Sequence, residues 1–211
     1  MLTYPRALIA SGALCVLLPV TLAAQEFSAD VVFTPVVSKA VATTARPPAP
    51  TVRSAKLYVR KEQLRLETHG VTGLVMLVDG ANHTTVAMFP PQKAYQPLGS
   101  RPRQYFRVAD PERACADWQE AVGKKIECKK DGRETGEGRA VVKYSRALGS
   151  GSEESVWVDR KLNYVVKWRS DQGEAQLRDI KEGPQSPELF TVPQDYKLQS
   201  PRKSRSSPME R

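Results

Sequence analysis

The sequence predicts a mainly β fold, built on one large antiparallel sheet of about 9–11 strands. Short apolar runs rich in β-branched residues alternate with turn residues at roughly 8–12 residue spacing along most of the 211-residue chain. Several of these runs pair into hairpins, and the sequence contains one convincing helix. One helix of about a dozen residues covers little of such a sheet, so the sheet either closes on itself or leaves part of an apolar face for a ligand.

Residues 1–24 have the organisation of a secretory signal peptide. Arg6 precedes an apolar run that continues to the end of this segment, where small residues provide a cleavage site near Ala23 or Ala24. The run of about 18 residues also approaches the length of a membrane span. No basic stop-transfer cluster follows it, so we expect cleavage rather than an uncleaved anchor. Cys15 lies in the middle of the run, which argues against a lipoprotein-type anchor.

The remaining chain is expected to form a single domain over residues 25–198. Within it, residues 42–54 are proline-rich and predict a loop or insertion. Residues 199–211 are basic, rich in serine and nearly free of apolar side chains, which predicts a disordered tail. Four Lys and Arg residues against Glu210 give this tail three of the formal charges that make up the total of +9. The basic excess suggests contact with an anionic membrane surface, and export argues against nucleic acid.

Two hairpins are predicted in the first half of the domain, after a strand at residues 27–33. KLYVRKEQLRLE, residues 56–67, turns at Lys61-Glu62. This register pairs two apolar couples and one couple of opposite charge, which favours it: Val59 with Leu64, Leu57 with Leu66, and Lys56 with Glu67. LVMLVDGANHTTVAMF, residues 74–89, turns at residues 79–82. Its first strand is apolar on both faces and needs cover on both. A short strand, AYQPL, follows.

The predicted helix is DPERACADWQEAVG, with Asp110 as N-cap, Pro111 at the first helical position and Gly123 just past the end. Cys115 on its apolar face and Cys128 in the next strand form an even pair in an exported chain. They predict a disulfide that ties the helix to that strand. A zinc site is the alternative, but the spacing is poor for zinc and no histidine lies nearby.

SVWVDRKLNYVVKW, residues 155–168, predicts a further hairpin with a two- or four-residue loop around Arg160-Lys161. That loop would place Trp157 opposite Tyr164, Val156 opposite Val165, and Glu154 opposite Lys167. One face would then carry Trp157, Tyr164, Val166 and Trp168. Such an aromatic face is either packed core or the wall of a cavity. Residues 138–148 and 174–182 predict strands, residues 186–189 predict a single helical turn, and 190–198 form the end piece.

Residues suited to catalysis are sparse. His69 and His83 have no accompanying nucleophile and carboxylate motif. The aspartates near strand ends are expected in turns for conformational reasons. No spacing indicates a phosphate loop or a metal cluster. We therefore predict no enzymatic activity, no cofactor and no metal.

Five segments occur in the order typical of the LolA-like superfamily of exported bacterial proteins, which the chain resembles over residues 27–198. They are KLYVRKEQLRLET, LVMLVDG with its hairpin, SVWVDRKLNYVVKW, EAQLRDIKEG and ELFTVPQDYKL. The resemblance implies an unclosed half-barrel in the periplasm, with a helix and short helical turns covering a concave face whose cavity holds acyl chains. The chain is similar to uncharacterised members with a cysteine pair around the helix, rather than to the carrier LolA itself.

The resemblance also implies which residues contact an acyl chain. The candidates are Leu57, Val59, Leu64, Leu66, Val75, Leu77, Val86, Met88, Trp157, Tyr164, Val166 and Trp168. Arg65 matches an arginine implicated in closing the lid, although the predicted register places it on the face opposite Leu64 and Leu66. We expect a monomeric, non-enzymatic protein that binds lipid or lipoprotein acyl chains, with a role in trafficking to the outer membrane. The alternative is an envelope protein-interaction or stress-sensing module on the same fold.

Overall fold

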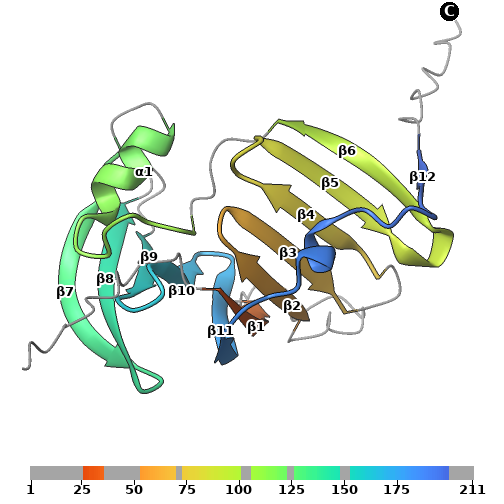
Figure 1. Cartoon of the computed structure of the whole chain (residues 1–211). Coiled ribbons are helices and arrows are strands. Elements are labelled where there is room, and N and C mark those ends of the chain that lie inside the picture. The colour runs from red at the N-terminus through yellow and green to blue at the C-terminus, as the bar shows by residue number, and fades with distance from the viewer. Residues whose placement is uncertain are drawn as a thin grey trace, which may run out of the picture.

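The computed structural model describes residues 26–35, 53–69, 73–100, 106–122, 126–147 and 153–199. They form one sheet with one α-helix and two short 3-10 helices (Figure 1). The elements in chain order are β1 Phe27–Pro35, β2 Arg53–Arg60, β3 Gln63–Thr68, β4 Val75–Asp79, β5 Thr84–Phe89, η2 Pro90–Gln92, β6 Ala94–Ser100, α1 Ala114–Val122, β7 Lys129–Gly136, β8 Arg139–Ala147, β9 Glu153–Asp159, β10 Tyr164–Ser170, β11 Gly173–Glu182, η3 Pro187–Phe190 and β12 Lys197–Leu198.

The strand order in the sheet is β12-β6-β5-β4-β3-β2-β1-β11-β10-β9-β8-β7. All neighbouring strands are antiparallel except β12 and β6, which run parallel through two residue pairs. The first strand, β1, therefore lies inside the sheet between β2 and β11. The end strands β12 and β7 do not pair with each other, so the sheet is open. This confirms the predicted unclosed, mainly antiparallel architecture, with twelve strands where about 9–11 were expected.

Three predicted segments fall wholly or largely outside the described residues. The signal segment 1–24 and the tail from residue 200 onward lie outside them. So does most of the proline-rich stretch 42–54, whose last two residues belong to β2.

The hairpin of β2 and β3 has the predicted register. Leu57 pairs with Leu66, Val59 with Leu64, and Lys56 with Glu67. The two-residue turn is tight, and Lys61 has a φ of 49°, which suits a turn whose twist matches that of the strands.

The hairpin of β9 and β10 differs from the predicted register. Asp159 pairs with Tyr164 and Val158 with Val165, but a bulge at Val166 then brings Lys167 opposite Trp157. The turn has four residues because the Asp159 carboxylate accepts the backbone N–H groups of residues 161 and 162, each at 2.8 Å. A bulge adds one residue to one strand and so moves the following side chains to the other face.

Helix α1 begins at Ala114, three positions later than an N-cap at Asp110 predicts. Asp110 does act as a cap, but of a turn: its Oδ1 accepts the Glu112 N–H at 2.8 Å, and its carbonyl accepts the Arg113 N–H at 3.0 Å. The Asp117 carboxylate reaches back from the first turn of the helix to the Ala109 N–H at 2.6 Å. Residues 109–113, which we call the lead-in, are therefore fixed as a turn, and the helix starts after them.

Apolar side chains form three clusters. The central cluster joins β1, β2 and β3 to β8, β9, β10 and β11 and includes Phe27, Val59, Trp157, Tyr164 and Leu177. The helix-side cluster lies between α1 and strands β8–β10. The strap-side cluster joins β4 and β5 to the C-terminal strap, which we define as residues 183–199. Figure 1 shows this strap, including η3, crossing the middle strands of one half of the sheet while α1 lies beside β7–β9 at the other end.

Candidate functional site

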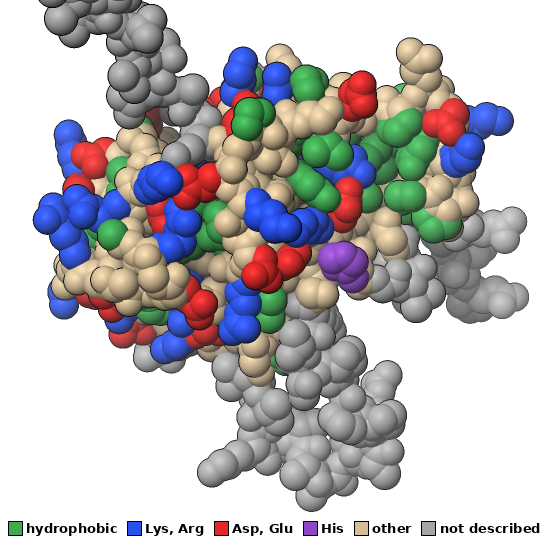
Figure 2. Space-filling model, turned by 60° about the horizontal axis from the view of Figure 1, so that its bottom comes forward, with side chains coloured by type: hydrophobic (Ala, Val, Ile, Leu, Met, Phe, Trp, Pro, Cys, Tyr) green, Lys and Arg blue, Asp and Glu red, His purple; other side chains and the backbone are tan. Residues whose placement is uncertain are grey.

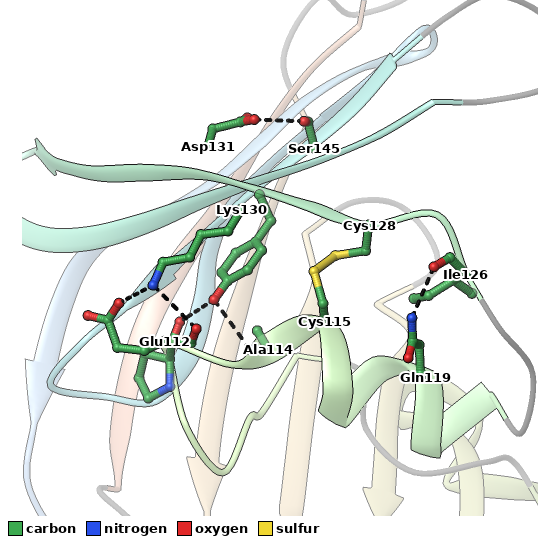
Figure 3. Close-up of a disulfide and its surroundings, with 11 residues drawn as sticks. Glu112, Ala114, Cys115, Gln119, Ile126, Cys128, Lys130, Asp131 and Ser145 are labelled. Carbon is green, nitrogen blue, oxygen red and sulfur yellow. Dashed lines mark hydrogen bonds and ion pairs between the residues drawn. A yellow bond between two sulfur atoms is a disulfide. The ribbon is translucent and has the colours of Figure 1, made fainter.

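The disulfide between Cys115 and Cys128 fastens α1 to the residue preceding β7, as predicted, with a Cα–Cα distance of 5.7 Å. One turn further along the helix, the Gln119 side-chain amide donates to the Ile126 carbonyl at 3.1 Å. Figure 3 shows both links on the same side of α1. Helix α1 and residues 126–128 before β7 are thus held together as one unit, which we call the roof.

The Tyr144 hydroxyl fixes the start of the roof to the sheet. It donates to the Pro111 carbonyl at 2.7 Å and lies 3.4 Å from the Ala114 backbone nitrogen, whose N–H it accepts. Trp118 packs edge-on against the Tyr144 ring, with centroids 5.4 Å apart. Burial of the phenol raises the pKa of Tyr144 above its usual value, so it stays a neutral donor. The roof is therefore tied to β8 by polar and aromatic contacts together.

The sheet face below the roof changes character in three successive rows across β8, β9 and β10. Cross-strand pairing defines the rows, because directly opposed residues share a face. The first row is Val142, Val158 and Val165; the second is Tyr144, Val156 and Trp168; the third is Arg146 and Glu154, with Ser170 two residues beyond Trp168. The face thus grades from aliphatic through aromatic to charged.

A pocket of about 640 Å³ lies between this face and the roof, within the range of about 300–1,000 Å³ common for small-molecule sites. Its walls come from the linker before α1, from the roof, from Val165 of the first row and from the second and third rows. The lining residues are Phe106, Trp118, Ile126, Cys128, Tyr144, Ser145, Arg146, Glu154, Val156, Val165, Trp168, Arg169 and Ser170. The arrangement offers an apolar interior with a polar rim.

Phe106 completes the aromatic wall. Its ring lies 5.4 Å from that of Trp168 and 6.2 Å from that of Tyr164. It is 38% exposed, so part of its apolar surface is open to solvent at the pocket.

Trp157 lies on the other face of the hairpin and does not line the pocket. Its indole N–H donates to Glu134. Three cations lie over its ring, the closest being Lys167 at 4.9 Å, followed by Lys143 at 5.6 Å and the Arg169 guanidinium at 5.7 Å. Each such contact is favourable, and Trp157 is 8% exposed within the central cluster. Its environment is that of a structural residue.

The twelve sequence-predicted cavity residues are divided among the three clusters. Leu57, Val59, Leu64, Leu66, Trp157, Tyr164 and Val166 belong to the central cluster or pack against it. Val75, Leu77, Val86 and Met88 belong to the strap-side cluster. Trp168 alone of the twelve lines the pocket.

Sequence reasoning missed Trp118, Tyr144 and Val156 as pocket residues. The signal for them was the apolar helix face together with its cysteine. The disulfide pins the helix to the start of β7, which pairs with β8, and β8 is the first of the three strands that carry the pocket.

Arg65 contacts the C-terminal strap. Its Nη1 donates to the Leu189 carbonyl of η3 at 2.9 Å, and its Nε pairs with Glu67 at 2.5 Å. The pairing of β3 with β2 and β4 is regular, so Arg65 lies on the face opposite Leu64, as the register predicts. It holds the short helix that covers the strap-side cluster, which contains Val192 of the strap.

Charge is divided unevenly along the chain. The described ranges contain 21 of the 32 Lys and Arg and 22 of the 23 Asp and Glu residues, so their formal charge is −1 against +9 for the whole chain. Figure 2 shows blue and red side chains interspersed on the face in view. The described sheet and helix are therefore close to neutral, and the basic excess belongs to other segments.

Within the described ranges, no three His, Cys, Asp or Glu side chains are grouped so that they could hold a metal ion. No helix in that same part of the chain has the length and apolar character required to cross a bilayer.

No family profile and no curated protein matches the sequence. Among solved structures, an uncharacterized conserved protein from Thermus thermophilus superposes with a TM-score of 0.51 at 7% identity, covering 83% of this chain and 90% of that one. MucB of Pseudomonas aeruginosa, solved in complex with MucA, gives 0.47 at 13% identity, covering 81% of this chain but 56% of that one. The Mycobacterium tuberculosis lipoprotein LppX gives 0.35 at 14% identity, covering 76% and 85%. At 7% identity, the Thermus protein supports the fold alone.

Proposed function

We propose that the pocket under the roof binds the acyl chain of a lipid or lipoprotein, and that the protein is a non-enzymatic binding protein. The observation that carries the proposal is the graded face of β8–β10, apolar and aromatic under α1 and charged at its rim. An amphiphile has the same gradient along its length. Burial of the chain would contribute about 0.8 kcal/mol per methylene.

The proposal places the ligand against Trp118, Tyr144, Val156 and Trp168, with Phe106 at the side. Of the residues that the sequence suggested, Trp168 is the one that the proposal retains as a ligand contact. The remaining eleven are proposed to support the fold through the central and strap-side clusters.

The disulfide supports an oxidising compartment. With the predicted signal segment, this favours the periplasm, a single exported domain over residues 25–198, and a role in lipid or lipoprotein trafficking. Attachment to an anionic membrane would then depend on basic segments such as the tail, because the described residues carry almost no net charge.

A second candidate function is a protein-interaction module, favoured by the edge of the sheet at β6. Strand β12 covers only Ala94 and Tyr95 of this seven-residue strand. Leu98 of β6 and Leu198 of β12 are 39% and 59% exposed. An open edge of this kind can accept an extended segment of a partner protein as an added strand.

Native mass spectrometry of the protein purified from the periplasm separates the two candidates. A co-purifying acyl species at one per chain supports the pocket. Trp168→Glu should remove that species while circular dichroism shows a folded sheet, and the control Leu98→Glu at the β6 edge should retain it. An empty wild-type protein that also fails to take up an added fatty acid would refute lipid binding. Loss of a bound partner in Leu98→Glu would favour the second candidate.

A further inference from the structure

The rim of the pocket carries an ion pair that faces its mouth. Arg146 of β8 lies directly opposite Glu154 of β9, and its Nη2 donates to the Glu154 carboxylate. Their side chains are 42% and 34% exposed, and both residues line the pocket. Arg146 lies two positions after Tyr144 on β8, and Glu154 lies two positions before Val156 on the antiparallel β9, so both extend the same face outward.

The pocket lining contains three charged residues. Two arginines, Arg146 and Arg169, line the pocket against the single carboxylate of Glu154. The Arg169 guanidinium is held away from the pocket face: its nitrogens lie 2.5 and 2.8 Å from a Glu174 oxygen, and it lies over the Trp157 ring. Of the two lining arginines, Arg146 is therefore the one left to contact a ligand.

Arg146 retains donors for a ligand. A guanidinium carries five N–H donors in a planar fork, and the contact with Glu154 involves Nη2. Oxyanions such as carboxylate and phosphate match this fork, and charge-assisted hydrogen bonds to them are stronger than those to a neutral hydroxyl. Glu154 fixes the orientation of the arginine but also competes with an incoming anion for it.

We infer that the pocket selects amphiphiles with an oxyanion head group. Arg146 binds the negative head group, and Glu154 both orients Arg146 and competes with the incoming anion for it. The inference rests on the proposed acyl-chain binding and adds the chemical class of the head group. It applies to carboxylate and phosphate heads alike, since both offer oxygens to the guanidinium. Screening by salt should weaken the selectivity.

The test compares ligands that share one acyl chain. Palmitic acid, palmityl phosphate and the neutral monopalmitoylglycerol are titrated into the protein with its disulfide intact, in competition with a fluorescent acyl probe. Wild-type protein should prefer the two anions. Arg146→Gln should weaken both anions about fivefold, as expected for a partly exposed charge contact, and leave the neutral ligand within about twofold. Glu154→Gln should strengthen both anions and leave the neutral ligand unchanged.

Opposite effects from two neighbouring positions cannot result from general destabilisation. Arg178→Gln, an exposed arginine on β11 outside the pocket lining, is the matched control and should change nothing. Equal binding of all three ligands by wild-type protein, or equal losses for all three in Arg146→Gln, would overturn the head-group inference while leaving acyl binding intact. Failure of every ligand and of the probe would overturn both proposals. Displacement of palmityl phosphate by inorganic phosphate alone would show a site for a free anion and would also overturn the inference.

Discussion

Trp157 and Trp168, eleven positions apart in one hairpin, lie on opposite faces because Val166 is bulged. One is enclosed by cations over the central cluster, and the other forms a wall of the pocket. We therefore expect separable contributions, from Trp157 to stability and from Trp168 to the proposed ligand binding.

Replacing each tryptophan by alanine should show this separation. Trp157→Ala removes a nearly buried indole and should lower the free energy of unfolding by about 3 kcal/mol. Trp168→Ala should cost less stability but weaken binding of an acyl probe about tenfold. Urea denaturation and probe titration measure the two quantities. An equal loss of probe affinity in both variants would contradict the assignment of Trp157 to stability and Trp168 to binding.

Removing the disulfide should loosen the roof. The bridge closes a loop with a sequence separation of 13, and its loss should lower the free energy of unfolding by about 3 kcal/mol on the chain-entropy account. Hydrogen exchange should rise in α1 before it rises in β1 or β11. The variant Cys115→Ser with Cys128→Ser removes the bridge, and Cys115→Ala with Cys128→Ala controls for the polarity of the serine hydroxyls. Unchanged exchange in α1 would show that the other contacts hold the roof unaided.

Two buried tyrosines provide a matched pair for the contribution of a hydroxyl. Tyr144→Phe loses the donation to Pro111 and the acceptance from Ala114, so it should destabilise the protein by about 1–2 kcal/mol. The Tyr164 hydroxyl is buried and finds no hydrogen-bond partner among the described residues. Tyr164→Phe should therefore be neutral or stabilising. Thermal unfolding of the two variants side by side tests this difference, and equal destabilisation would contradict it.

The lead-in to α1 should loosen at acidic pH. Hydrogen bonds from Lys130, and then from Arg133, hold the pKa of the Glu112 carboxyl below its usual value. A carboxylate with a lowered pKa in the folded state stabilises the protein above the unfolded-state value, about 4.3. That stabilisation is lost as the pH falls through the folded-state pKa. The stability difference between wild type and Glu112→Gln should shrink toward zero as the pH is lowered. A constant difference across this range would show that the charge is not involved.

The contact of Arg65 with the strap should stabilise the strap but not the roof. Arg65→Leu removes the hydrogen bond to the Leu189 carbonyl, so amide exchange should increase in residues 187–199. Protection of α1, at the other end of the sheet, should not change. Equal loosening of α1 would show that the strap and the roof are coupled.

The sequence predicted the parts of the fold that depend on local pairing. The β2–β3 register follows from a two-residue turn and three complementary pairs, all within residues 56–67. The β9–β10 register could not be read in the same way. Its four-residue turn depends on side-chain capping by Asp159, and the Val166 bulge depends on how β10 meets both neighbouring strands.

The candidate site was harder to predict because alternation shows which side chains share a face but not what covers that face. Leu77 and Leu57 have similar patterns, yet Leu77 lies under the strap and Leu57 in the central cluster. Only packing between distant segments decides this. The cysteine pair is the one sequence feature that links the helix to this end of the sheet. Its spacing predicts a disulfide but does not show that Cys128 lines a pocket.

The position of β1 inside the sheet has a consequence for biosynthesis. Strand β1 pairs with β11, and Phe27 lies opposite Glu182. The hydrogen-bond ladder between these two strands can therefore form only after β11 has been synthesised. Contacts of such sequence separation slow folding. Strands β1–β6 are consecutive neighbours and can pair with one another first, but the sheet is complete only when β11 pairs with β1. A chain with this topology builds its sheet as two runs of sequential strands, β1–β6 and β7–β11, and the late pairing of β1 with β11 joins the two halves.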